Sequence, residues 1–143
     1  MLQAANQQQE FLDNPAQWPQ APIVTLAEAF ADDRGVIQPL VDLPMRSALL
    51  IRTRPGGIRA NHYHKTDWHF IWVVSGQFEY HFRPVGAKTK PEMIVVKPGQ
   101  LLWTPPMLEH AMLYTEDCDI IVFCRNGRSQ EEYERDVVRV KLL

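Results

Sequence analysis

The chain has 143 residues, a formal net charge of −2 at pH 7 and 45% hydrophobic residues. This length suits one domain with a sizeable core, and the charge gives no electrostatic basis for binding nucleic acid or an anionic membrane. No apolar run approaches the roughly 20 residues of a membrane span, and the first ten residues lack the basic and apolar regions of a signal peptide. We therefore expect a cytoplasmic protein that binds neither nucleic acid nor membranes.

The N-terminal segment is polar, rich in glutamine and followed by several prolines. We predict an arm over residues 1–20 and a single domain over residues 21–143. Phe11, Leu12 and Trp18 are apolar enough for the arm to dock, and packing on a neighbouring subunit is the expected arrangement. The sequence therefore predicts a homodimer, with simple disorder of the arm as the alternative.

Short apolar or alternating segments separated by turn residues dominate the rest of the chain, and this pattern predicts a β-sandwich or barrel. The D-D-R-G sequence within residues 28–35 predicts a turn, and only Ser129–Asp136 has helical character. The expected strands after the arm, apart from the histidine-bearing one discussed below, are Ile23–Leu26, Val36–Val41, Ala48–Thr53, Phe70–Val74, Gln77–Arg83, Met93–Lys97, Leu101–Thr104, Ala111–Tyr114, Ile120–Cys124 and Val137–Leu142.

The two cysteines lie on one of these strands. Cys118 and Cys124 are six residues apart, so their Cα atoms are about 20 Å apart on an extended chain. A disulfide needs less than about 7 Å. We expect two unpaired, buried or half-buried thiols, in agreement with a cytoplasmic location.

The chemistry of the chain centres on the stretch from Gly56 to Gly76. His62 and His64 are two residues apart, so both imidazoles point to one face of a strand. His69 follows a polar K-T-D turn and begins the next strand, and a hairpin of this kind brings it back towards the first two. Convergent imidazoles on rigid strands are the donors that a borderline divalent metal prefers.

A second stretch, Gly99 to Tyr114, supplies a further histidine in a matching context. His110 follows a rigid T-P-P turn and precedes an apolar strand. His81 is the one histidine that we leave out of the site, because the alternation of its strand places it on the solvent side.

These two stretches resemble the two sequence motifs of the cupin family. Gly56, His62, His64 and Gly76 fit the first motif, with His69 in the position of its glutamate; Gly99, Pro105 and His110 fit the second, with Met107 and Tyr114 in the positions of its glycine and asparagine. The resemblance covers about residues 24–122. It implies an all-β fold, a double-stranded β-helix or jelly-roll barrel with the site inside, here with a short C-terminal helical segment.

The resemblance also implies one divalent transition metal per chain, held by His62, His64, His69 and His110. Imidazole in the glutamate position disfavours Mg²⁺ and Ca²⁺ and favours zinc, nickel or iron. Two alternatives stay open: Asp67 shares the parity of His69 and is a second candidate for the fourth ligand, or His69 turns outward and leaves three histidines.

Two further residues near His110 are assigned from strand parity. Glu109 has the opposite parity and is expected to face away from the site. Tyr114 shares the parity of His110 and is a candidate catalytic proton donor near the metal.

The segment R-A-N-H-Y-H-K is similar to that of small cupins of nucleotide-sugar and capsule metabolism, including the epimerase type. The resemblance implies a small, oxygen-rich substrate, sugar-like or with a carbonyl or enol group. Our leading hypothesis is a metal-dependent enzyme with isomerase/epimerase-type or dioxygenase chemistry. The alternatives are a non-catalytic metal- or sugar-binding module, and a metal-free, epimerase-like barrel in which His62 or His64 is the proton-transfer base.

Overall fold

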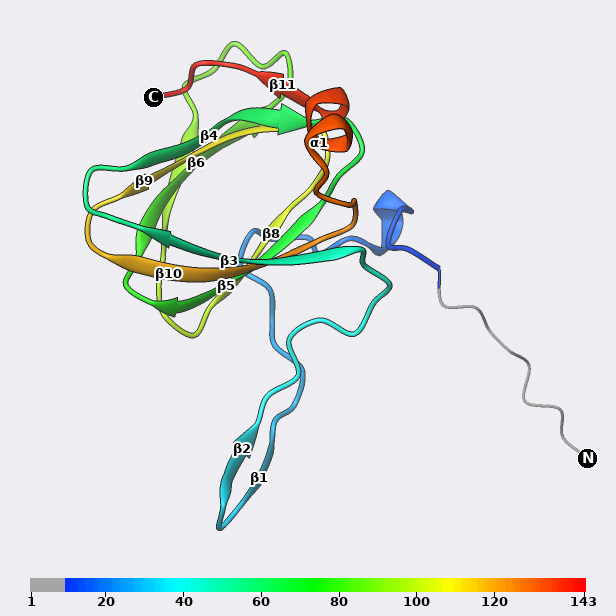
Figure 1. The fold of residues 1–143 in the computed structure, drawn as a ribbon, viewed down its shortest axis with the longest axis vertical. Helices are drawn as coiled ribbons and strands as arrows, with labels where there is room; N and C mark the ends of the chain where they lie inside the picture. Colours follow the sequence, from blue (N-terminus) through cyan, green and yellow to red (C-terminus); the bar gives the residue numbers. More distant parts are fainter. Residues whose placement is uncertain (1–9) are drawn as a thin grey trace, which may run out of the picture.

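The computed structural model describes residues 10–143, which form mostly antiparallel β-strands (Figure 1). Their elements are η1 (Pro15–Gln17), β1 (Phe30–Asp32), β2 (Gly35–Ile37), β3 (Ser47–Thr53), β4 (Ile58–His64), β5 (His69–Ser75), β6 (Phe78–Pro84), β7 (Glu92–Val96), β8 (Leu101–Thr104), β9 (Leu108–Tyr114), β10 (Cys118–Cys124), α1 (Gln130–Asp136) and β11 (Val137–Arg139).

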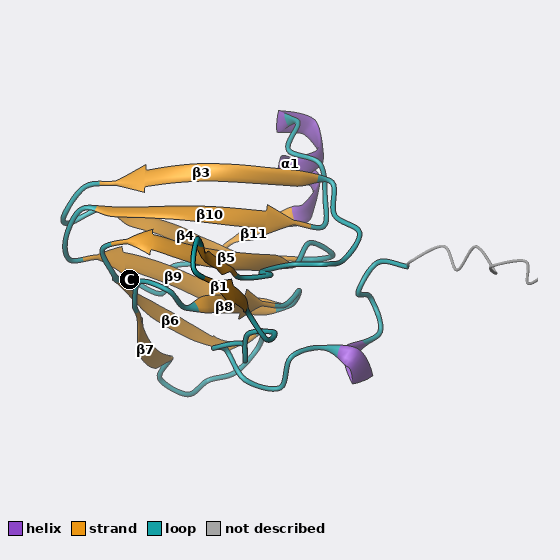
Figure 2. Ribbon diagram, turned by 90° about the horizontal axis from the view of Figure 1, so that it is seen from below, coloured by secondary structure: helices purple, strands orange, loops and turns teal. Residues whose placement is uncertain are grey.

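Two sheets form the barrel. One has four strands in the order β3-β10-β5-β8, and the other has five in the order β11-β4-β9-β6-β7. The two sheets face each other, and α1 lies at one end of the barrel (Figures 1 and 2). The predicted all-β jelly-roll fold with a short C-terminal helix is confirmed.

Strand alternation explains the core. On β10, the side chains of Cys118, Ile120, Val122 and Cys124 are buried between the sheets, while the intervening residues are half-buried on the outside. Both cysteines are free and buried, as predicted.

The N-terminal third differs from the sequence prediction. Instead of a strand over residues 23–26, only Ile23 makes an isolated bridge, to Leu102. Phe30–Asp32, expected as part of a turn, forms β1, and β2 ends at Ile37. This segment forms a separate hairpin whose two strands pair only with each other, so no neighbouring strand extends its pairing. The turn predicted at D-D-R-G joins the two strands.

The described part of the arm packs on the barrel of its own chain. Leu12 and Trp18 belong to a second apolar cluster with Trp68 and Trp103, and the rings of Trp18 and Trp103 are 5.7 Å apart between centroids. The predicted arm covers residues 1–20, of which residues 1–9 lie outside the described residues. The boundary between arm and domain therefore stays a prediction, and so does the homodimer.

Among the described residues, no helix is both long enough and apolar enough to cross a membrane. The cytoplasmic location stays a prediction.

Candidate functional site

Two neighbouring strands of the five-stranded sheet position the first histidines. His62 on β4 lies opposite His110 on β9, next to a register shift between Ala60 and His62. Ala60 and Asn61 have φ angles of 67° and 54°, which is the left-handed region that L-residues seldom adopt. This β-bulge inserts an extra residue into β4 and sets the direction of the side chains that follow it.

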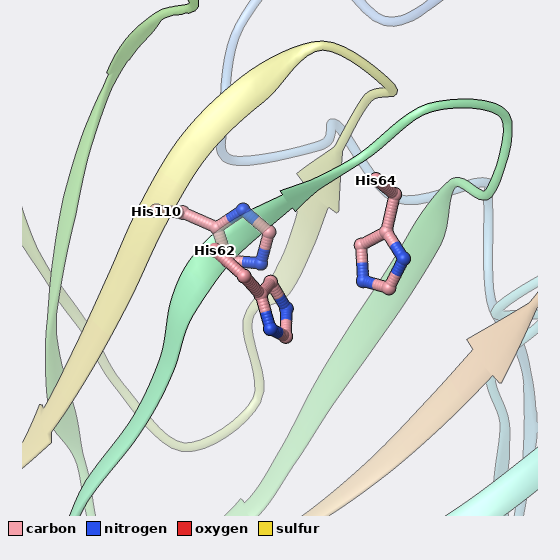
Figure 3. Close-up of side chains that lie close together, drawn as sticks. All are labelled: His62, His64 and His110. Atoms are coloured by element: carbon pink, nitrogen blue, oxygen red, sulfur yellow. The ribbon is translucent and has the colours of Figure 1, made fainter. Parts of the chain in front are cut away.

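His62, His64 and His110 converge on one point. One nitrogen of each ring lies within 4.8 Å of the others, and all three side chains are buried. The ring centroid of His62 is 4.7 Å from that of His64 and 4.9 Å from that of His110. Figure 3 shows the three rings directed into the same space, two from β4 and one from β9. We call these three residues the histidine trio.

His64 also belongs to a second group, with Asp67 and His69, whose donor atoms lie within 4.8 Å of one another. His69 Nε2 is 2.8 Å from Asp67 Oδ2, and the other oxygen of Asp67 accepts a hydrogen bond from the backbone N–H of Asn126. The four predicted histidines therefore gather at one place but form two overlapping groups. The structure brings His69 against Asp67, which strand parity had marked as an alternative ligand.

Asp136, at the C-terminal end of α1, connects the two groups. Its carboxylate accepts a hydrogen bond from His64 Nδ1 at 2.9 Å and others from the backbone and hydroxyl groups of Thr66. The backbone N–H of Asp67 also points to it, at 3.3 Å. Pairing of β11 with β4 places Val137 opposite His64, which fixes Asp136 beside the imidazole.

These contacts determine the tautomers. The carboxylate of Asp136 and the carbonyl of Leu108 are acceptors, so the Nδ1 atoms of His64 and His110 carry the protons that are donated to them. Their Nε2 atoms are left with free lone pairs. His64 Nε2 is buried and has no hydrogen-bond partner among the described residues, which is costly for a polar atom unless something else binds it.

Burial keeps the trio neutral. It lowers the pKa of His62 to about 2 and that of His110 to about 3, and the neighbouring histidines add to both shifts. Burial also lowers the pKa of His64, although the hydrogen bond to Asp136 opposes this. At neutral pH these three rings are therefore uncharged imidazoles, each with one nitrogen lone pair available to a ligand.

The carboxylates stay ionised. Burial raises the pKa of Asp136 and of Asp67, but the hydrogen bonds from His64 and Thr66 to the first, and from His69 to the second, outweigh it, so that both pKa values lie below the usual range. Two histidine–carboxylate pairs therefore stand side by side, with the rings of His64 and His69 4.7 Å apart.

A cavity of about 150 Å³ lies between the sheets beside these groups. Its polar lining includes His62, His69, His110 and the guanidinium-bearing residues Arg59 and Arg128. The rest is mainly apolar. The remaining lining residues are Leu49, Ile51, Ala60, Ile71, Met112, Tyr114, Ile120, Val122 and Tyr133.

Three further residues were assigned from the sequence, and only Tyr114 among them lines the cavity. Tyr114 lines the cavity and its hydroxyl donates to the sulfur of Met112 at 3.8 Å; burial raises its pKa, so it is a neutral phenol at pH 7. Its role as a proton donor stays a prediction. Glu109 forms an ion pair with Arg83 at 2.7 Å, and His81 bonds to Glu79 outside both histidine groups.

Sequence reasoning missed three residues of the site: Asp136, Tyr133 and Arg128. The ring of Tyr133 lies 6.3 Å from that of His62, and the Arg128 guanidinium stacks over Tyr133 at 4.6 Å. All three lie in or next to α1, far from the two histidine motifs in sequence. Only the fold reveals that the C-terminal segment closes over β4.

Comparison with solved structures supports the same architecture. A single-residue mutant of the 3,4-ketoisomerase QdtA from Thermoanaerobacterium thermosaccharolyticum, in complex with TDP-4-keto-6-deoxyglucose, matches with a TM-score of 0.63 and 17% identity over 78% of this chain and 82% of its own. A dTDP-6-deoxy-D-glucose-3,5-epimerase from Legionella pneumophila, in complex with dTDP-4-keto-L-rhamnose, matches with a TM-score of 0.59 and 15% identity over 73% and 66% of the two chains.

The capsular polysaccharide assembling protein CapF from Staphylococcus aureus matches with a TM-score of 0.60 and 22% identity, over 82% of this chain but only 34% of CapF. At these identities the likeness shows the fold, which is that of the cupins. No curated protein matches the chain at a significant level.

A family model described as the polysaccharide biosynthesis C-terminal domain matches residues 30–137. This range runs from β1 to the first residue of β11 and contains every histidine of the site. The chain therefore belongs to the polysaccharide biosynthesis C-terminal domain family and has the cupin fold.

Proposed function

We propose that the chain is a sugar-modifying enzyme of the isomerase/epimerase type, which moves a proton at the carbon next to the carbonyl group of a keto sugar. The observation that carries this proposal is that His69, hydrogen-bonded to the carboxylate of Asp67, lines a mainly apolar cavity. A neutral imidazole held by a carboxylate is the usual general base for proton abstraction. The fold is shared with a ketoisomerase and an epimerase whose bound ligands are keto-sugar nucleotides.

Access to the cavity favours His69 as the base. His69 lines the cavity, and its Nε2 proton is donated to the Asp67 carboxylate, which leaves Nδ1 as the basic atom. His64 has a similar pair with Asp136, but its Nε2 is buried and the residue does not line the cavity. A base must come within hydrogen-bond reach of the proton that it removes, so His69 fits this role better than His64. His62 also lines the cavity, but among the described residues it lacks a carboxylate partner like the one that His69 has in Asp67. His69 is therefore preferred to both bases expected for a metal-free barrel.

The histidine trio fits a transition metal. The orphaned His64 Nε2 faces two further imidazoles, and the Nδ1 atoms of His64 and His110 donate to a carboxylate and a carbonyl, the pattern that orients metal-ligating histidines. We therefore assign His62, His64 and His110 as the residues that would hold zinc, nickel or iron. Such an ion would supply Lewis acidity for an oxygen of the substrate.

The protein's own residues perform the remaining tasks. Asp67 fixes the ring of His69 and stabilises the imidazolium that forms when it takes the proton. Ile51, Ile71 and Val122 exclude water from the substrate side of the cavity. Tyr114, a neutral phenol on the same cavity, is the candidate donor for the return of a proton.

The proposal is tested by incubating the protein in D₂O with a panel of nucleotide-linked 4-keto sugars and following deuterium incorporation next to the carbonyl by NMR. We expect His69→Asn to slow the exchange by about 100-fold or more, while the matched control His81→Asn keeps the wild-type rate because His81 lies outside the site. Equal rates for the wild type and His69→Asn would exclude His69 as the base.

Metal analysis of protein purified without a histidine tag separates the alternatives. One ion per chain that disappears in the His62→Ala/His64→Ala double variant supports the trio as the metal site. Exchange without any metal supports the metal-free barrel, metal without turnover supports a binding module, and oxygen consumption with bound iron supports dioxygenase chemistry. A double variant that keeps its full metal content contradicts the assignment of the trio.

A further inference from the structure

The turn that joins β4 to β5, residues 65–67, is bonded to the C-terminal end of α1 (Figure 1). From the sequence, K-T-D is only a polar break between two strands. In the structure the backbone N–H of Lys65 donates to the carbonyl of Asp136 at 2.9 Å, and its ammonium group donates to the carbonyl of Arg135 at 3.1 Å. A cation at the last carbonyls of a helix is a favourable contact, so the turn is fixed to α1.

Thr66, the central residue of this turn, holds the carboxylate of Asp136. Its backbone N–H and its hydroxyl both donate to Oδ1 at 2.7 Å, while His64 donates to Oδ2 at 2.9 Å. The backbone N–H of Asp67 lies 3.3 Å from the same Oδ2. Donors on both oxygens fix the plane of a carboxylate, and the carboxylate in turn fixes the ring of the histidine that bonds to it.

The hydroxyl of Thr66 is also linked to the second histidine–carboxylate pair, through Asn126. The side-chain amide of Asn126 donates to this hydroxyl at 3.0 Å, so the hydroxyl accepts one hydrogen bond and donates another. The backbone N–H of Asn126 donates to Oδ1 of Asp67 at 2.9 Å, and His69 donates to Oδ2 at 2.8 Å. One chain of contacts therefore connects the two pairs.

We propose that Thr66 is a positioning residue that orients His64 and His69 together, each through the carboxylate to which its ring bonds. The part that concerns His69 rests on the proposed function, in which His69 is the base. The hydroxyl is essential, because only a group that donates and accepts at once can bond to both of its neighbours. Serine keeps such a group, whereas valine has the shape of threonine without it.

NMR of the histidine side chains in the metal-free protein tests the proposal without any reaction. Long-range ¹H–¹⁵N spectra report which ring nitrogen carries the proton, and we expect the Nδ1–H tautomer for His64 and the Nε2–H tautomer for His69. In Thr66→Val we expect mixed tautomers for both rings and N–H protons that exchange with water about 10-fold faster. Wild-type spectra in Thr66→Val, or a change in His64 alone, would overturn the proposal.

Two variants serve as references for these spectra. Thr66→Ser should keep the wild-type tautomers, because it keeps the hydroxyl. Thr115→Val is the matched control, because Thr115 is exposed in the connection between β9 and β10. Thr66 is itself exposed and lines an open surface hollow beside α1, so its replacement removes no core packing and the variant is expected to fold.

Asn126→Ala interrupts the chain of contacts on the other side of the hydroxyl. It leaves the hydrogen bond between Thr66 and Asp136 in place, so we expect faster exchange of the N–H proton of His69 and little change in His64. This variant keeps the proposal testable if Thr66→Val fails to fold. An unchanged His69 in Asn126→Ala would show that the two pairs are not coupled.

Two further measurements separate positioning from a merely structural contact. In the D₂O exchange assay Thr66→Val should lower kcat by about 10-fold and change KM by less than about twofold, because the hydroxyl orients the base without touching the substrate. The zinc affinity should fall by about 10-fold, and Thr66→Ser should restore both values. A lower melting temperature with unchanged kcat and zinc affinity would contradict the proposal. If the wild type exchanges no sugar of the panel, the proposed function fails, while the spectra of the metal-free protein still decide the role of Thr66.

Discussion

At the scale of single residues, the position of Asp136 decides how His64 can act. Its carboxylate accepts a hydrogen bond from Nδ1–H of His64 and thereby directs the Nε2 lone pair towards His62 and His110. A ligand histidine without this partner is free to rotate and to change tautomer. The asparagine side chain keeps the shape of aspartate but loses its charge, so Asp136→Asn tests the electrostatic part of this contact alone.

We expect Asp136→Asn to lower the affinity for zinc by about 10–100-fold, measured by competition with a chromogenic chelator. Glu134→Gln is the control, because Glu134 lies on the same helix and pairs with Arg139 on the surface. An unchanged zinc affinity in Asp136→Asn would mean that His64 is not oriented by this contact.

The depressed pKa values of His62 and His110 lead to a prediction for the metal-free protein. In the unfolded chain both titrate near pH ~6.5, whereas in the folded protein the pKa values are about 2 and about 3. Between these limits the unfolded state binds more protons, so the free energy of unfolding falls as the pH drops below about 6.5. The stabilisation that comes from keeping His62 and His110 neutral in the folded protein is fully present above about pH 6.5.

Urea titrations of the EDTA-treated protein at pH 7 and pH 5 measure this effect. Each histidine contributes at most about 1.4 kcal/mol per pH unit, so we expect a loss of roughly 2–4 kcal/mol over this interval for the pair. His62→Gln should remove about half of the slope. A free energy of unfolding that does not change between the two pH values would argue that the trio is open to water.

Much of the site was predictable at this scale, because strand parity is a strong rule. The two-residue spacing of His62 and His64, and of Asp67 and His69, correctly places each pair on one face. Parity marked Asp67 as an alternative fourth ligand of a metal, and its hydrogen bond to His69 was not part of that prediction. Asp136 was not predictable, since its approach to His64 depends on the pairing of β11 with β4, which is a long-range contact.

At the scale of elements, the bulge in β4 connects backbone geometry to the site. Ala60 has a φ of 67°, which costs an L-residue with a Cβ about 1–2 kcal/mol. Asn61 tolerates the left-handed region better, and its side-chain oxygen accepts hydrogen bonds from the backbone N–H groups of Leu142 and Leu143. The C-terminal segment thus holds the bulge that precedes His62.

Glycine has no penalty at a positive φ, so we expect Ala60→Gly to leave the stability unchanged or to raise it by up to about 1 kcal/mol. Ala48→Gly on β3 is the matched control, because Ala48 lies inside a regular strand and glycine there should cost about 0.5–1 kcal/mol. Denaturant unfolding of both variants measures the difference. Equal destabilisation by the two substitutions would show that the bulge is not strained.

The elements were predictable where apolar alternation is regular. The strands β5, β6, β7, β8 and β10 match the predicted ranges closely, because each packs one face against the core. The strand predictions were wrong for residues 23–26, where only Ile23 makes a bridge, and for residues 38–41, whereas the turn at D-D-R-G was correct. Ile23 packs against the core of the barrel, but Val24, Leu26 and Val41 pack on the second apolar cluster instead. The apolar side chains of β1 and β2 are exposed, so their pattern carries no information about the barrel.

At the scale of the whole molecule, the arm and the hairpin have different roles. Trp18 Nε1 donates to the carbonyl of Leu12 at 3.0 Å, and Asp13 pairs with Arg125 on the barrel at 2.7 Å. The guanidinium of Arg125 also lies over the ring of Phe11. These contacts hold the described part of the arm on its own chain, whereas the apolar side chains of β1 and β2 face outward.

We therefore expect a variant that lacks residues 1–20 to be less stable but to keep the dimer constant of the full chain. Removal of Leu12 and Trp18 uncovers Trp103 and Phe70, which belong to the same apolar cluster, and Trp18→Ala alone should cost about 2–3 kcal/mol because it loses the ring contact with Trp103. Thermal unfolding measures the first effect and sedimentation the second. Gln17→Ala, at an exposed neighbouring position, is the control. If the truncated protein instead loses its dimer and keeps its melting temperature, the arm crosses to the partner, as the sequence alone predicts, and the contacts with Trp103 and Arg125 are made between chains.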